Sequence, residues 1–139
     1  MSQETVSISQ PINATPAQVW ALIGNFHGIM DWFPGVTECR PEGNGVGAIR
    51  HLTMADGSVI SDRLVAEQPG QSYSYEIAAG EIPMKNYLGT VSVEPNRNGS
   101  TLRYHGSFEV TDEQREPATG FIKQIYTGAF ENARQLLET

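Results

Sequence analysis

Short alternations of apolar and polar residues recur along most of this chain, and each one favours a β-strand that is buried on one side. The first runs from Thr5 to Ile12, with Val6 and Ile8 on its apolar side. Turns rich in Gly, Pro and Asn separate the later ones at about ten-residue spacing. These later strands are expected at 36–42, 47–54, 58–67, 71–79, 85–94 and 100–110.

Two helical patterns follow the first strand, and a third closes the chain. Thr15 and Pro16 favour a helix start, because Thr is a good N-cap and Pro fits the first turn; this helix is expected to end at Gly24. Residues 26–33 form a second, short helical or turn segment. Over residues 116–138, a stripe of apolar side chains predicts a long amphipathic helix. The residues of that stripe are Ile122, Ile125, Tyr126, Ala129, Ala133, Leu136 and Leu137.

This order of elements, with many strands and the helices gathered at one side, indicates an α+β fold. We expect a curved, seven-stranded antiparallel sheet wrapped around the long C-terminal helix, with space left beneath the helix. No repeat or linker interrupts the chain, so its 139 residues are interpreted as one domain, 1–139. The helix residues expected to face the sheet are Ile122, Ile125, Ala129 and Ala133.

One predicted hairpin, over residues 50–64, places two charged residues on its apolar side. If Gly57 takes the left-handed position of a three-residue loop, Arg50 lies directly opposite Asp62. A two-residue loop would place Arg50 opposite Arg63, which like-charge repulsion disfavours. A cation and a carboxylate buried together are costly unless they are paired. The two residues therefore form either a structural ion pair or the polar floor of a cavity.

Strand phase gathers further aromatic and apolar side chains on this inner side of the sheet. Tyr75, Tyr87 and Tyr104 share it with aliphatic residues, and an apolar surface with few polar groups is typical of a small-molecule site. Gly89 and Gly106 interrupt two strands, where a glycine allows a bend or close approach and leaves volume free. The alternative interpretation is plain core packing. The candidate ligand-binding residues are Arg50, Leu52, Met54, Ile60, Asp62, Tyr75, Ile77, Tyr87, Gly89, Tyr104, Gly106, Phe108, Ile125 and Ala129.

The order of elements, together with the segment VWALIGNFHGIMDWFPGV, resembles the START and pollen-allergen-like helix-grip (SRPBCC) superfamily. Within it, the chain is most similar to bacterial polyketide cyclase/dehydrase-like proteins. The segments ADGSVISDRLVAEQPGQSYSYEI and IPMKNYLGTVSVEP also resemble the plant abscisic-acid receptors. The resemblance covers essentially the whole chain. It implies an elongated cavity between sheet and helix for a hydrophobic or amphipathic small molecule.

The resemblance to the receptors also assigns positions. It implies that loops 54–58 and 81–86 flank the mouth of the cavity. Two departures stand out: Gly35 replaces the lysine that holds the ligand carboxylate in the receptors, and Gly106 replaces an acidic cavity residue. Hormone binding is therefore not implied. The positions that match cavity residues are Arg50, Asp62, Tyr75 and Tyr87.

Charge and composition limit the classes of partner and the cellular location that we expect. A net charge of −7 argues against nucleic acid or an anionic membrane surface as partner. Cys39 is the single cysteine, which suits a reducing compartment, and neither a signal peptide nor an apolar stretch of about 20 residues appears. We therefore expect a cytoplasmic protein without integral membrane association, either a monomer or a homodimer.

The histidines do not form a metal-binding pattern. His27, His51 and His105 lie on different elements, and none has a second ligand at metal-binding spacing. Strand phase turns the latter two outward, so no histidine is expected to meet a serine across the cavity. We expect neither a metal nor a cofactor.

Two functional hypotheses remain. The first is a non-catalytic protein that carries or senses a hydrophobic small molecule. The second is a cyclase- or dehydrase-type enzyme, in which Asp62 is the general base, Arg50 stabilises an oxyanion, and Tyr87 or Tyr104 donates a proton. Against the second, pairing with Arg50 is expected to lower the pKa of Asp62 and weaken it as a base. A protein-interaction module is a third possibility with no specific residue behind it.

Overall fold

The computed structural model describes residues 2–138 and contains one antiparallel sheet with helices on its inner side. The seven strands are β1 (Ser2–Ile12), β2 (Val36–Glu42), β3 (Ile49–Met54), β4 (Val59–Gln68), β5 (Ser72–Ala79), β6 (Lys85–Asn96) and β7 (Gly99–Val110). Between β1 and β2 lie the helix α1 (Pro16–Ile23) and the 3₁₀-helix η1 (Phe26–Asp31), and α2 (Arg115–Glu138) ends the chain.

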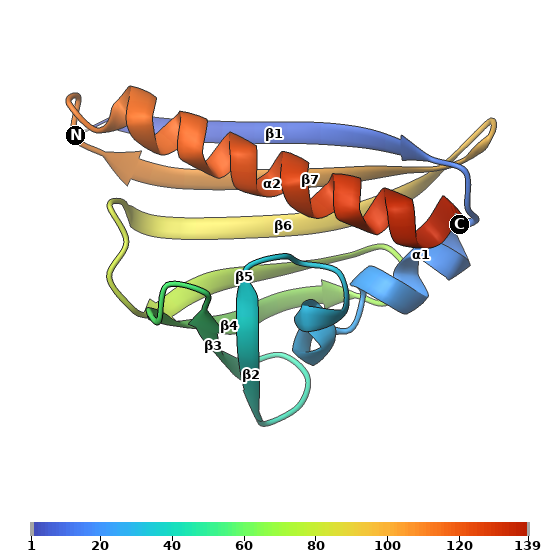
Figure 1. The fold of residues 1–139 in the computed structure, drawn as a ribbon, viewed down its shortest axis with the longest axis horizontal. Coiled ribbons are helices and arrows are strands. Elements are labelled where there is room, and N and C mark those ends of the chain that lie inside the picture. Colours follow the sequence, from blue (N-terminus) through green and yellow to red (C-terminus); the bar gives the residue numbers. More distant parts are fainter. Residues whose placement is uncertain (1, 139) are drawn as a thin grey trace.

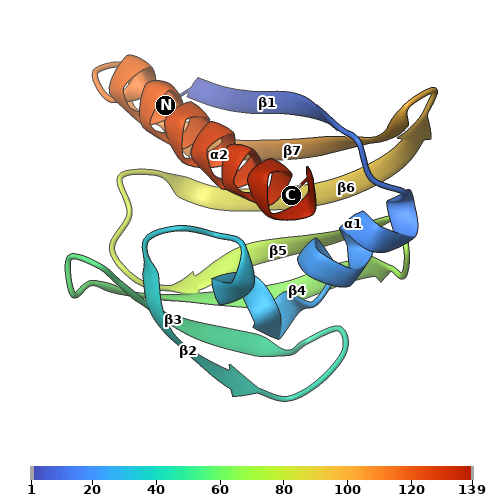
Figure 2. The same ribbon diagram turned by 45° about the vertical axis from the view of Figure 1, so that its right-hand side comes forward.

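The strands follow the order β1-β7-β6-β5-β4-β3-β2, so β1 pairs with the last strand instead of with its neighbour in sequence. The sheet curves around α2, which packs mainly against β1 (Figures 1 and 2). The predicted helix-grip architecture is confirmed. Within residues 2–138, no helix is long and apolar enough to cross a membrane.

Local sequence explains both ends of α1. The Thr15 side chain accepts a hydrogen bond from the backbone N–H of Gln18, whose side chain in turn accepts one from the backbone of Thr15. This reciprocal capping box satisfies donors that the first helical turn leaves unpaired. At the other end, the backbone N–H of Gly24 donates to Trp20.

The inner face of α2 is apolar and buried. Ile122, Ala129 and Ala133 contribute to the core as expected, and Phe130 joins them with no exposed surface. Ile125 is only partly buried and borders a pocket. The helix therefore covers one half of the sheet and leaves room over the other half.

Candidate functional site

The hairpin of β3 and β4 places Arg50 directly opposite Asp62, as the sequence predicts. Gly57 has a φ of +89°, which is the left-handed conformation that the three-residue loop requires. The backbone N–H of Met54 donates to the carbonyl of Ser58 over 2.8 Å and closes that loop. Turn geometry and charge pairing thus agree on a single register.

Arg50 and Asp62 form a buried ion pair. The Nε of Arg50 donates to Oδ2 of Asp62 over 2.9 Å, and the side chains are 0% and 5% exposed. Nη1 donates to the carbonyl oxygen of Phe26, also over 2.9 Å. The guanidinium lies 4.2 Å from the ring centre of Phe26 and 4.8 Å from that of Tyr75, within cation–π range.

Burial raises the pKa of the Asp62 carboxyl above its ordinary value, and Arg50 offsets only part of this effect. Pairing with Arg50 lowers the pKa as expected, but the expectation that the pKa of Asp62 is lowered overall is wrong. The physical reason is that the carboxylate loses its water on entering the core, and a single hydrogen bond to Arg50 does not replace it.

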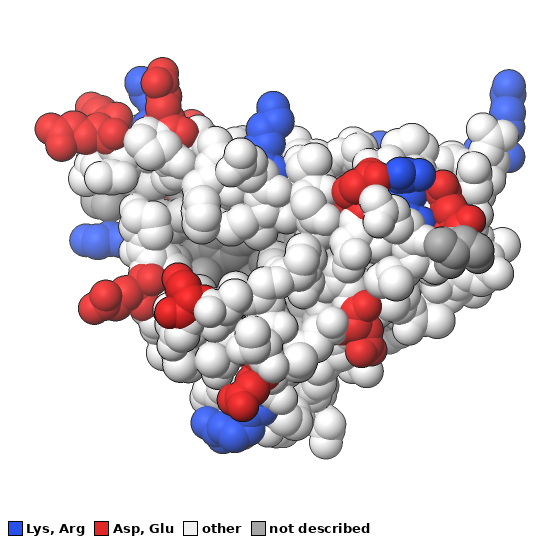
Figure 3. Space-filling model, viewed as in Figure 1, with Lys and Arg blue, Asp and Glu red and all other residues white. Residues whose placement is uncertain are grey.

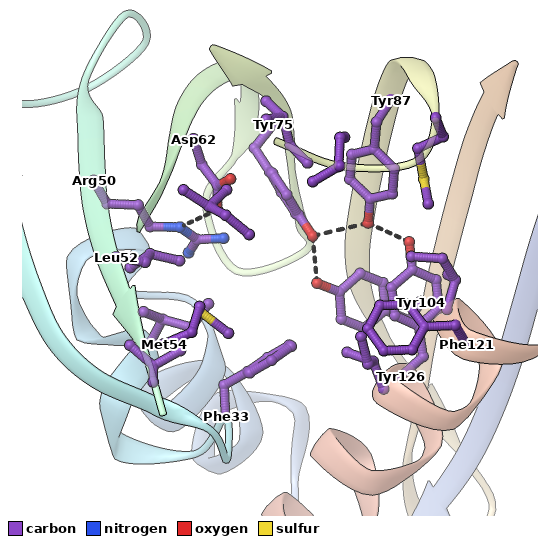
Figure 4. A pocket seen from close by; sticks show the side chains of 18 of the residues that line it. Phe33, Arg50, Leu52, Met54, Asp62, Tyr75, Tyr87, Tyr104, Phe121 and Tyr126 are labelled. Atoms are coloured by element: carbon purple, nitrogen blue, oxygen red, sulfur yellow. Dashed lines mark hydrogen bonds and ion pairs between the residues drawn. The ribbon is translucent and has the colours of Figure 1, made fainter. Parts of the chain in front are cut away.

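Next to this pair, four tyrosine hydroxyls form a continuous hydrogen-bonded chain (Figure 4). Tyr104 Oη lies 2.5 Å from Tyr75 Oη, which lies 3.0 Å from Tyr87 Oη. Tyr87 in turn bonds to Tyr126 of α2. Burial raises the pKa of all four phenols, and the proximity of the other rings adds to the shift for Tyr75, Tyr87 and Tyr104. The hydroxyls therefore stay protonated at neutral pH.

The two strand glycines lie beneath this chain. A Cβ at Gly89 would be 2.7 Å from the ring of Tyr75, and a Cβ at Gly106 would be 2.1 Å from the hydroxyl of Tyr126. The expectation of a close approach at Gly89 is confirmed. The expectation that these glycines leave free volume is wrong, because tyrosine side chains from β5 and α2 occupy it.

A pocket of about 120 Å³ opens between this polar network and the first half of α2. Ten of the candidate ligand-binding residues line it: Arg50, Leu52, Met54, Ile60, Asp62, Tyr75, Ile77, Tyr87, Tyr104 and Ile125. The other four, Gly89, Gly106, Phe108 and Ala129, lie outside its lining. The first two lie under tyrosine side chains, and Phe108 and Ala129 have no exposed surface in the core.

Nine residues line the pocket that the list of candidate residues did not contain. Tyr126 had a usable signal, because it follows Ile122 by one helical turn on the apolar stripe of α2. The resemblance had already placed loop 81–86 at the mouth, and Ile122 was expected on the sheet-facing side of the helix. Ile29, Phe33 and Val36 had no signal, because the turn segment that positions them does not follow a strand or helix period. The nine residues are Ile29, Phe33, Val36, Ile82, Pro83, Met84, Phe121, Ile122 and Tyr126.

The mouth of the pocket lies between α2 and the loop that joins β5 to β6. Ile82, Pro83 and Met84 of that loop line it, together with Phe121, which is 54% exposed. From the loop at 54–58, Met54 alone contributes. The space-filling view shows a hollow on this face, below the first half of α2 (Figure 3).

The histidines lie away from the pocket lining. His51 Nδ1 is 2.7 Å from the hydroxyl of Ser61, and its Nε2 is 3.4 Å from Glu42. This row resembles a serine–histidine–carboxylate arrangement, but strand alternation places it on the side of β3 opposite Arg50. Among residues 2–138, no group of three or more His, Cys, Asp or Glu side chains is placed to hold a metal ion.

Comparison with known proteins assigns the chain to a family. Residues 3–138 match the family described as polyketide cyclase/dehydrase and lipid transport. The chain belongs to this family. The predicted resemblance to polyketide cyclase/dehydrase-like proteins is confirmed.

Three relatives illustrate how far the similarity extends. XoxI from Bacillus cereus has a TM-score of 0.85 at 29% identity, over 99% of this chain and 96% of that one. Norcoclaurine synthase from Thalictrum flavum, in complex with dopamine and hydroxybenzaldehyde, has a TM-score of 0.78 over 97% of this chain and 86% of that one; its 15% identity shows the fold alone. MLP-like protein 423 from Arabidopsis thaliana is 36% identical over 77 residues, which are 50% of each chain. The match covers 50% of MLP-like protein 423 and 41% of a second curated relative, so it spans half of their length or less.

Proposed function

We propose that this protein binds a small, mostly apolar molecule in the pocket beside Arg50 and Asp62, as a carrier or a sensor. The proposal rests on one observation above all: an apolar pocket in which a guanidinium, a carboxylate and four phenols converge. An apolar lining with a few convergent polar groups is the ordinary composition of a small-molecule site. Membership of a family described by lipid transport as well as cyclase activity also supports it.

The size of the pocket restricts the ligand. An apolar cavity of about 150 Å³ in another protein holds one benzene molecule. The volume here is about 120 Å³, so the enclosed part of the ligand is about one ring. A longer molecule would extend through the mouth past Phe121, or would require the loop after Gly80 to move. Gly80 has a φ of +123°, which few other residues adopt.

Two neighbouring residues of β4 provide a matched test. Ile60 lines the pocket, whereas Val59 points away and is 55% exposed. Ile60→Trp is expected to weaken the binding of an environment-sensitive apolar dye by about tenfold or more, because the indole fills the pocket. Val59→Trp is expected to bind the dye like the wild type. Equal dye binding by all three folded proteins would contradict the proposal.

Native mass spectrometry of freshly purified protein gives an independent measurement. A co-purifying small molecule would identify the ligand class by its mass.

The second candidate function is general acid–base catalysis of the cyclase or dehydrase kind. One observation favours it: burial raises the pKa of Asp62 towards the range of an effective base, in contact with a pocket that also holds phenol donors. Incubation with a bound carbonyl compound decides between the two candidates. Recovery of that compound unchanged supports the carrier, whereas loss of water or ring closure, abolished in Asp62→Asn, supports the enzyme.

A cytoplasmic location, the absence of a nucleic-acid partner and a monomeric or homodimeric state stay predictions from the sequence. Size-exclusion chromatography with light scattering tests the last of these directly.

A further inference from the structure

The wall of the pocket has a formal charge of zero, and this balance restricts what can bind there. Of the lining side chains within residues 2–138, only Arg50 and Asp62 are charged, and they are paired over 2.9 Å. An ion entering this site would add a charge without a partner to a pocket with a mainly apolar lining. Such a charge is costly to bury.

Arg50 still has hydrogen-bonding capacity. A guanidinium has five N–H groups. The N–H of Nε donates to Asp62, and Nη1 donates one hydrogen bond to the carbonyl of Phe26. Nη2 is buried and has no hydrogen-bond partner among the residues that the structure describes. A buried donor of a charged group is costly when left unpaired, so an acceptor placed beside Nη2 would be stabilised there.

The tyrosine chain has a donor to spare as well. Its four hydroxyls contain four hydrogens, but only three hydrogen bonds join them. Whichever direction the chain takes, one hydroxyl hydrogen has no acceptor within it. All four tyrosines line the pocket, so this donor borders the same pocket as the guanidinium (Figure 4).

We propose that the ligand is an uncharged molecule of about one ring with a hydrogen-bond acceptor such as a ketone or aldehyde carbonyl. This inference rests on the binding function proposed above and defines the ligand class for that same pocket. The carbonyl oxygen accepts from Arg50 Nη2 or from the spare phenol, and the ring contacts the apolar wall. A carboxylate of the same shape is rejected, because it leaves the site with one uncompensated negative charge.

Three probes of similar shape test the proposal by isothermal titration at neutral pH: acetophenone, ethylbenzene and benzoate. Acetophenone is expected to bind about tenfold more tightly than ethylbenzene, which lacks the acceptor. Benzoate is expected to bind at least about tenfold more weakly than acetophenone.

Variants of the ion pair are then expected to change the relative affinities for the three probes. Asp62→Asn leaves the site with one net positive charge, so benzoate is expected to gain about tenfold in affinity. In Arg50→Met/Asp62→Leu, the preference for acetophenone over ethylbenzene is expected to shrink. A matched control is Arg63→Met/Glu76→Gln, which alters an exposed pair between β4 and β5 on the opposite face of the sheet. The control is expected to keep the wild-type order of the three probes.

The outcomes separate this inference from the proposed function. If ethylbenzene binds as tightly as acetophenone, or benzoate binds best to the wild type, the inference is overturned while the binding function stands. If the folded protein binds none of the three probes and no co-purifying molecule is found, the binding function fails and the inference fails with it. Should Asp62→Asn not fold, the double variant of Arg50 and Asp62 and its control decide.

Discussion

The hydroxyl of Tyr126 lies directly over Gly106, on the strand that faces α2. A Cβ at that position would be 2.1 Å from the hydroxyl oxygen and 3.1 Å from the ring carbon that bears it. The first distance is impossible for a real contact, whereas the second is merely tight. The absence of a side chain at Gly106 therefore leaves the space that the Tyr126 hydroxyl occupies.

A substitution at Gly106 is therefore expected to destabilise the protein, and a second substitution at Tyr126 is expected to restore part of that stability. Gly106→Ala is expected to lower the free energy of unfolding by about 1–3 kcal/mol, because the added methyl displaces Tyr126. Adding Tyr126→Phe removes the clashing oxygen, so Gly106→Ala/Tyr126→Phe is expected to recover part of the loss. Urea denaturation measures both. Simple additivity of the two single changes would show that the methyl and the hydroxyl do not meet.

At the scale of elements, the hairpin of β3 and β4 determines the chemistry of the pocket. Its turn sets the register, and the register decides that Arg50 meets Asp62 instead of Arg63. A shift by one residue would place Arg50 and Asp62 on opposite faces of the sheet. The ion pair is therefore a direct consequence of the left-handed conformation at Gly57.

Breaking the pair is expected to be far more costly than replacing it. Asp62→Ala leaves Arg50 buried without its carboxylate, which we expect to cost about 3–5 kcal/mol. Arg50→Met/Asp62→Leu removes both charges and is expected to lie within about 1 kcal/mol of the wild type or above it. Chemical denaturation of both variants gives the comparison. A loss below about 1 kcal/mol for Asp62→Ala would mean that water reaches Arg50 through the pocket.

The elements themselves were largely predictable from their periodicity. The alternating segments became strands and the apolar stripe became α2, with boundaries that moved by a few residues. β1 begins at Ser2 instead of Thr5, because it pairs with β7 along its whole length and Ser2 lies opposite Val110. Pairing with a distant partner extends a strand beyond the segment where its own sequence alternates.

At the scale of the whole molecule, the tyrosines link stability to alkaline pH. The folded protein raises the pKa of Tyr75, Tyr87, Tyr104 and Tyr126, whereas unfolded tyrosine ionises near about pH 10. The folded state therefore retains protons that the unfolded chain releases. The stability from these groups is fully present below about pH 10 and is lost as pH rises towards the folded pKa values.

We accordingly expect cooperative alkaline unfolding in which tyrosine ionisation and loss of structure coincide. Above about pH 10, each of the four phenols is expected to lower the free energy of unfolding by about 1.4 kcal/mol per pH unit. Tyrosinate absorbance and circular dichroism, recorded together, measure the two events. Tyr126→Phe is expected to show a shallower dependence. Smooth ionisation near about pH 10 with unchanged circular dichroism would contradict the buried chain.

The sequence by itself determined the strands, the long helix, the register of the Arg50–Asp62 hairpin and ten of the residues that line the pocket. These follow from period and turn chemistry, which act between residues close in the chain or paired across one turn. Only the tertiary structure decided that Tyr126 meets Tyr87, 39 residues away, and that Arg50 donates to the carbonyl of Phe26. Those contacts depend on where α2 and η1 cross the sheet. Tertiary packing also reversed two expectations, since burial outweighed pairing at Asp62 and tyrosine rings occupied the space above the glycines.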